Sequence, residues 1–207
     1  MTLRAVITTL LFVPLFSLSV HATTPGAEEV VKTTSEQVLQ KLIQEKEELA
    51  AHPDRLYGMV NQLIVPHFDF SSMSKWVLGK NWRNATPEQR QQFIEQFKNL
   101  LVRTYAKTLL EYSDEKITYL PLESNANSNL VVVKTEIQQP SGAGTLPIHY
   151  RMHISGGEWK VVDVAVDGVS LVSTYRGSFG SEIRKNGLDA LIAKLAERND
   201  KLESSIE

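Results

Sequence analysis

Cysteine is absent from this chain of 207 residues, which excludes disulfide bonds and lipid attachment through an N-terminal cysteine. A strong excess of one charge is also missing, because 22 Lys and Arg stand against 24 Asp and Glu, a formal net charge of −2. That balance is unlike a nucleic-acid-binding protein, and a hydrophobic content of 42% is unlike a disordered chain. The composition is that of an ordinary globular protein and predicts no nucleic-acid partner.

Long hydrophobic runs are scarce, and the clearest one lies at the N-terminus. It covers residues 5–20, follows the positive charge of Arg4 and precedes a small-residue site at Ala22. These features are typical of a signal peptide, residues 1–22, and predict export and a mature chain of net charge −3. A membrane anchor is the alternative, but about 16 apolar residues interrupted by Pro14 are fewer than the roughly 20 that span a bilayer.

Familiar catalytic motifs are missing: there is no nucleophile elbow, no phosphate-binding glycine loop and no zinc-ligand spacing. His149 and His153 share one face of a predicted strand, but at about 3.3 Å per residue they lie roughly 13 Å apart, too far to share a metal ion. His67 and Asp69 could form an acid–base pair, although Asp69 is also suited to cap a helix. The residues therefore predict no metal site, no cofactor and no catalytic group.

Two acidic side chains near the end of the strand region leave an enzymatic alternative open. Asp163 could be buried and act as a general base, or Tyr105 could transfer the proton instead; in the other reading Asp163 pairs with a neighbour or faces water. Asp167 followed by Gly168 is typical of a cap and a turn. An exported enzyme with a cavity between helices and a sheet is the corresponding hypothesis.

Apolar spacing and capping residues divide the mature chain into helices, then strands, then helices. The clearest helix begins with a capping box of Thr86 and Gln89 around Pro87 and is about 25 residues long. The predicted helices cover 28–51, 53–66, 69–79 and 87–112, with two more between 167 and 197.

Period-two alternation predicts four strands, at 115–123, 129–138, 145–155 and 158–168. Short turn-like connections favour a curved antiparallel meander with one apolar face, which the helices must cover. The fold class is therefore α+β, with a single domain over 23–198 and a frayed tail at 199–207.

The segment 167–187 has the apolar spacing of a helix but contains Gly177 and Gly180, each of which costs about 1 kcal/mol relative to alanine in a helix interior. Serine and glycine fall on the side opposite the large residues. Because small residues let another backbone approach closely, we expect this helix to be buried on both sides, with the Ser/Gly side against protein. The large side consists of Val172, Tyr175, Phe179 and Ile183.

Basic and aromatic residues alternate in the segment 74–85. Tryptophans flanked by cations could stack on nucleic-acid bases, but negative net charge and export favour a partner surface or a lipid-headgroup contact. An ordinary loop whose tryptophans pack into the core is the third possibility. The residues concerned are Lys75, Trp76, Lys80, Trp82 and Arg83.

The segments VLGKNWRNATPEQRQQF and DVAVDGVSLVSTYR resemble the MlaC, or toluene-tolerance, family of periplasmic phospholipid carriers of Gram-negative bacteria. The resemblance extends from about residue 28 to residue 197, although the first helix and the hairpins match only in pattern. It implies a periplasmic lipid shuttle that maintains outer-membrane lipid asymmetry and holds phospholipid acyl chains in an apolar cavity between sheet and helices. The implied partners are an inner-membrane ABC transporter complex, contacted through its substrate-binding subunit, and an outer-membrane lipoprotein associated with porins.

Such a shuttle requires an apolar lining and an open mouth. At about 0.8 kcal/mol per methylene, a two-chain lipid with on the order of 30 methylenes has a gross burial term near 25 kcal/mol. Given the resemblance, large residues on the predicted inward faces are the candidates for lipid contact. If the protein is instead a non-lipid adaptor without a cavity, the same residues form an ordinary core. These candidates are Leu63, Phe70, Met73, Val77, Phe97, Leu101, Tyr105, Tyr150, Met152, Val164, Val172, Tyr175 and Phe179.

Overall fold

The computed structural model describes residues 26–111, 115–122, 129–139 and 144–204, so the expected signal peptide lies outside the described residues. The helices are α1 Ala27–Ala51, α2 Pro53–Leu63, η1 Val65–His67 (a 3-10 helix), α3 Phe70–Leu78, α4 Lys80–Asn84, α5 Pro87–Glu111, α6 Leu171–Asn186 and α7 Leu188–Ser204. The strands are β1 Ile117–Tyr119, β2 Leu130–Gln138, β3 Thr145–Ser155, β4 Glu158–Val166 and β5 Val169–Ser170. Within the described ranges, no helix combines the length and apolar character needed to cross a bilayer.

The five strands form one antiparallel sheet in the order of the sequence, β1-β2-β3-β4-β5. This confirms the meander and the α+β class, with one strand more than predicted. The additional strand, β5, exists because Asp167 and Gly168 both adopt positive φ values, 49° and 77°, and reverse the chain in a two-residue Asp-Gly turn.

Strand β4 contains a β-bulge at Val162, which separates residues that pack in two different parts of the molecule. Arg151 of β3 is opposite Asp163, but the next residue, Met152, is opposite Val161, so Val162 has no partner in β3. An extra residue of this kind bends a strand and increases its twist.

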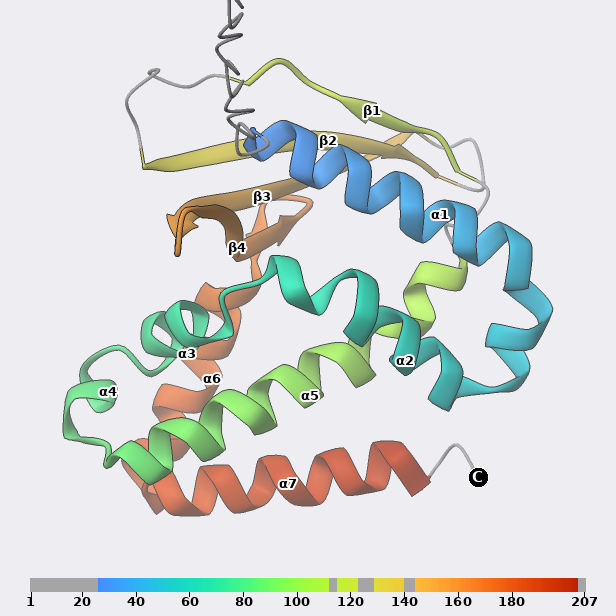
Figure 1. Ribbon diagram of the computed structural model, residues 1–207. Helices are drawn as coiled ribbons and strands as arrows, with labels where there is room; N and C mark the ends of the chain where they lie inside the picture. Colours follow the sequence, from blue (N-terminus) through green and yellow to red (C-terminus); the bar gives the residue numbers. More distant parts are fainter. Residues whose placement is uncertain (1–25, 112–114, 123–128, 140–143, 205–207) are drawn as a thin grey trace, which may run out of the picture.

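Figure 1 shows how the helices lie beside the sheet, and three clusters of apolar side chains hold these layers together. The bundle core joins α3, α5, α6 and α7 to the bulge of β4 and consists of Met73, Val77, Leu78, Phe93, Phe97, Leu100, Leu101, Val162, Val172, Phe179, Leu191, Ile192 and Leu195. The seam joins the first turns of α1 to the sheet and consists of Ala27, Val31, Val131, Val133, Met152 and Val161. The third cluster joins α1, α2 and α5 and consists of Val38, Leu42, Leu49, Leu56, Met59, Val60, Val102 and Ala106.

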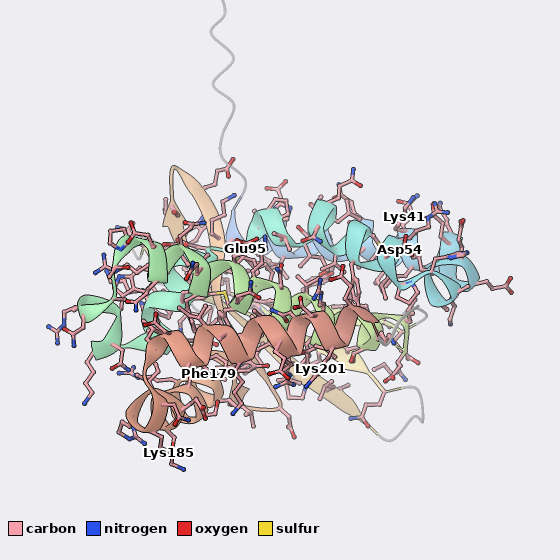
Figure 2. The ribbon with its side chains drawn as sticks, turned by 90° about the horizontal axis from the view of Figure 1, so that it is seen from below. Lys41, Asp54, Glu95, Phe179, Lys185 and Lys201 are labelled. Carbon is pink, nitrogen blue, oxygen red and sulfur yellow. The ribbon has the colours of Figure 1, made fainter. Side chains whose placement is uncertain are left out.

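The C-terminal tail expected to be frayed at 199–207 is helical up to Ser204, so that prediction is wrong for these residues, and 205–207 lie outside the described residues. Asn199 is 2% exposed, and its side-chain amide donates to the Gln96 backbone oxygen at 2.9 Å. Arg103 of α5 also donates to the Glu203 carboxylate at 2.8 Å. These contacts hold the last two turns of α7 alongside α5, across the underside of the bundle (Figure 2). Sequence spacing missed them because the stabilising groups lie about 100 residues away in the chain.

The close approach expected on the Ser/Gly side of α6 is also wrong. Gly177 is exposed, and a Cβ placed there would meet no atom within 4 Å. A Cβ on Gly180 would meet only the side chain of Arg184, at 3.6 Å. The helix is stabilised from its other side, where Tyr175 and Phe179 pack edge to face against Phe97, with ring centroids 5.3 and 6.1 Å from it.

Replacing Gly177 by alanine therefore tests the environment of this helix face. We expect Gly177→Ala to stabilise the protein by about 0.5–1 kcal/mol, because it adds helix propensity without a clash. Gly79→Ala is the contrasting variant: Gly79 has φ +54°, and its added Cβ would lie 3.1 Å from the Arg176 guanidinium. It should destabilise by roughly 1–3 kcal/mol. Urea unfolding measures both changes, and a destabilised Gly177→Ala would contradict the exposed face.

Candidate functional site

The seam is the place where helix and sheet meet over apolar side chains. Val31 of α1 lies above Val131 and Val133 of β2 and Met152 of β3, and all four side chains are buried. Other apolar side chains pack against this cluster while keeping part of their surface exposed; they are Val30, Phe68, Tyr119, Leu122, Tyr150, Trp159 and Val164. The seam thus combines a buried floor with a partly open apolar border.

The polar groups inside the seam are few and uncharged. Thr135, 1% exposed, donates its hydroxyl to the Ile148 backbone oxygen at 3.1 Å. Burial raises the pKa of Tyr150 to about 12, although a hydrogen bond with Thr135 opposes the shift. Burial likewise raises the pKa of Tyr119. Both phenols are therefore neutral at physiological pH, and the seam suits an apolar ligand.

The thirteen residues proposed as lipid contacts do not gather in one place. Tyr150, Met152 and Val164 belong to the seam or its border, and Leu63 packs against the third cluster. Tyr105 is 40% exposed and forms a hydrogen bond with Tyr175. The others belong to the bundle core or pack against it; they are Phe70, Met73, Val77, Phe97, Leu101, Val172, Tyr175 and Phe179. The sequence pattern did not separate residues of the seam from residues of the bundle core. It also did not name Val31, Val131 and Val133, which lie in the seam, as lipid contacts.

Surface hollows lie elsewhere. Two hollows on the surface of the described residues measure about 330 Å³, between α5 and α7, and about 400 Å³, among α3, α4 and α6. Neither lies between the sheet and the helices. The apolar cavity expected there remains a prediction, and acyl chains would require the side chains of the seam to separate.

Two carboxylates considered for catalysis have structural partners instead. Asp69 caps α3 by accepting from the Ser72 backbone N–H at 2.8 Å, and its other oxygen lies 2.8 Å from His153 Nε2. Asp163 accepts from the Val172 backbone N–H at 3.1 Å and from the Ser170 hydroxyl at 2.7 Å, at the start of α6. The predicted cap at Asp69 is confirmed, and its histidine partner is His153 rather than His67.

Comparison with known proteins identifies the family to which this chain belongs. Residues 32–197 match the family described as MlaC protein. The chain belongs to the MlaC family. Its relatives include the toluene tolerance protein ttg2D of Pseudomonas putida, 34% identical over 173 residues, which are 83% of this chain and 79% of the relative. The intermembrane phospholipid transport system binding protein MlaC of Haemophilus influenzae is 27% identical over 147 residues, 70% of this chain and 69% of that protein.

A solved structure supports the same assignment. The phospholipid-binding protein from Ralstonia solanacearum, solved in complex with a phospholipid, matches this chain with a TM-score of 0.80 at 33% sequence identity. The match covers 86% of this chain and 99% of that one. The resemblance to the MlaC family seen in the sequence is therefore confirmed over nearly the whole described domain.

The contacts of Asp69 predict how stability depends on pH. Burial alone would raise the pKa of this carboxyl, but hydrogen bonds from Ser72 and His153 outweigh burial and hold the pKa below its usual value. A depressed folded-state pKa stabilises the fold above the unfolded value, about 3.9, and this contribution disappears as pH falls through the folded value. We expect Asp69→Asn, which keeps a capping oxygen, to be less stable than the native chain at pH 7, and we expect this stability gap to narrow as pH falls toward 3.

Urea unfolding between pH 3 and pH 7 measures this difference. Asp200→Asn, an exposed carboxylate on α7, is the matched control and should follow the native curve. His67, whose pKa is lowered by burial and by the Lys160 charge, adds a separate loss of stability below about pH 6.5 that Asp69→Asn leaves in place. A stability gap that stays constant down to pH 3 would contradict the assigned role of the Asp69 charge.

Proposed function

We propose that this protein is a periplasmic phospholipid carrier, exported by a cleaved signal peptide, in which acyl chains occupy the seam between α1 and the sheet. It moves lipid between an inner-membrane ABC transporter complex and an outer-membrane lipoprotein–porin complex, and so maintains lipid asymmetry. The observation that carries the proposal is the phospholipid held by the Ralstonia solanacearum protein, which shares this fold at 33% identity. The proposal involves no catalytic step, metal or cofactor.

The packing of the layers supports the choice of the seam. Neighbouring strands pack closely along much of their length, and so do the helices of the bundle. In contrast, α1 lies close to β2 and β4 at only a few positions. Separating α1 from the sheet therefore disturbs fewer contacts than opening the bundle. The groups then exposed are largely apolar, as lipid chains require.

Extraction of the purified protein gives the direct test. Protein isolated from bacteria should release phospholipid into organic solvent, detected by mass spectrometry, and delipidated protein should take up phospholipid from vesicles. A protein that carries no lipid and takes up none would exclude the carrier. That result would favour the non-lipid adaptor with a filled core.

A pair of identical substitutions distinguishes the seam from the bundle core. Val164 borders the seam and is partly buried, whereas Val162, two residues away, is 0% exposed in the bundle core. We expect Val164→Phe to lower the lipid retained per folded molecule several-fold with little loss of stability, because the ring occupies the space proposed for an acyl chain. Val162→Phe should cost about 1–3 kcal/mol by overpacking and leave lipid retention unchanged.

Both variants are compared by lipid quantification and by urea unfolding on the same preparations. Loss of lipid only in Val162→Phe would place the acyl chains in the bundle core, where most of the sequence-predicted contacts lie. Equal loss of lipid in both variants would mean that retention follows general stability rather than the seam.

A further inference from the structure

We propose that the hollow among α3, α4 and α6 is a docking site for an acidic segment of a partner protein. Its lining comes from three helices and is basic and aromatic, with no acidic side chain; it consists of Lys75, Trp76, Lys80, Trp82, Arg83 and Arg176 around Gly79. The hollow shares no residue with the seam. It lies where α4 projects at the end of the bundle, away from α1 (Figure 1).

The four cations of this hollow are available to a ligand. Among the described residues, no carboxylate forms an ion pair with Lys75, Lys80, Arg83 or Arg176. The chain as a whole has a net charge of −2, so this accumulation of positive charge runs against its composition. Because charges more than about 8 Å apart are largely screened at physiological ionic strength, the local cations decide which ligand binds.

Backbone geometry leaves room for one of these cations beside Gly79. Gly79 adopts φ +54° between α3 and α4, and the Arg176 guanidinium lies where a side chain at Gly79 would begin. A Cβ at Gly79 would lie 3.1–3.3 Å from the guanidinium atoms. Arg176 therefore reaches across from α6 with its planar group against the backbone, and an arginine placed in this way can bind a carboxylate through two N–H donors.

The tryptophans favour a peptide over a membrane or a free anion. Trp76 and Trp82 are half-buried against the bundle core, and the Arg90 guanidinium lies 5.3 Å from the centre of the Trp82 ring. Rings packed this way line the hollow and present only part of their surface to a ligand. They offer apolar contact that a free phosphate ion does not use, whereas a peptide supplies both carboxylates and apolar side chains. Tryptophan and arginine are also enriched at protein interfaces.

Fluorescence anisotropy of a labelled peptide of alternating glutamate and leucine tests the site on the full chain. The double variant Lys80→Gln/Arg176→Gln should bind it about fivefold more weakly, the effect of losing two exposed charge contacts. The matched control is Arg184→Gln/Lys185→Gln, which removes the same charge from exposed residues further along α6, outside the hollow (Figure 2). The control should bind as the native chain does, and the same peptide with glutamine for glutamate should not bind.

Other outcomes would overturn the assignment. Equal weakening in both double variants would mean that the peptide senses only overall charge. Binding to phosphatidylglycerol vesicles without binding to the peptide would identify a membrane surface, and equally strong binding of inorganic phosphate would identify a small-anion site. Lipid retention should be unchanged in Lys80→Gln/Arg176→Gln, so failure of the docking site and failure of the lipid carrier are distinguishable.

Discussion

The bulge of β4 and the two carboxylates beside it determine how the helical bundle attaches to the sheet. Asp69 caps α3, contacts His153 of β3, and donates its backbone N–H to the Val161 oxygen at 2.9 Å. Asp163, on the other side of Val162, binds the first turn of α6 and lies 3.9 Å from Arg151 of β3. Since each carboxylate joins a strand to the start of a helix, α3 and α6 are fixed to the sheet independently of side-chain packing.

The bulge also separates two apolar regions that border the sheet, the seam and the bundle core. Val161 and Val164 lie on the seam side although they are three residues apart, because the bulge adds one residue to β4 between them; Val162 lies in the bundle core. The bundle core then closes around four aromatic rings contributed by α5 and α6. At the seam, α1 begins after Gly26 without a side-chain cap, and Ser35 of α1 forms a hydrogen bond with Tyr119 of β1.

Local signals in the sequence predicted most of the elements. Thr86 and Gln89 form the expected capping box, with hydrogen bonds of 3.0 and 3.2 Å, and β2 and β3 lie within one residue of their predicted bounds. These features depend on residues close in the chain. Asp69 and His153 are 84 residues apart, and no periodicity signals that contact.

The candidate site was predictable only in its chemistry. Alternation correctly assigned Tyr150 and Met152 to one face of a strand, yet it could not reveal that Phe97 and Val172 line a different cluster. The Ser/Gly side of α6 shows the same limit, because small residues are compatible with close packing and also with solvent exposure. Only the position of the neighbouring elements distinguishes the two, and here solvent lies beside Gly177.

The division of α1 between two clusters bears on how a carrier of this architecture could admit lipid. Ala27 and Val31 pack in the seam, whereas Val38, Leu42 and Leu49 hold the later turns against α2 and α5. Lifting the first turns exposes few side chains, at about 1.5–3 kcal/mol for each large one. Two acyl chains contribute a gross burial term of about 25 kcal/mol. On the proposed function, holding lipid in the seam is therefore favoured over lipid free in water by far more than the cost of displacing α1, while α2, α5 and the bundle core stay in place.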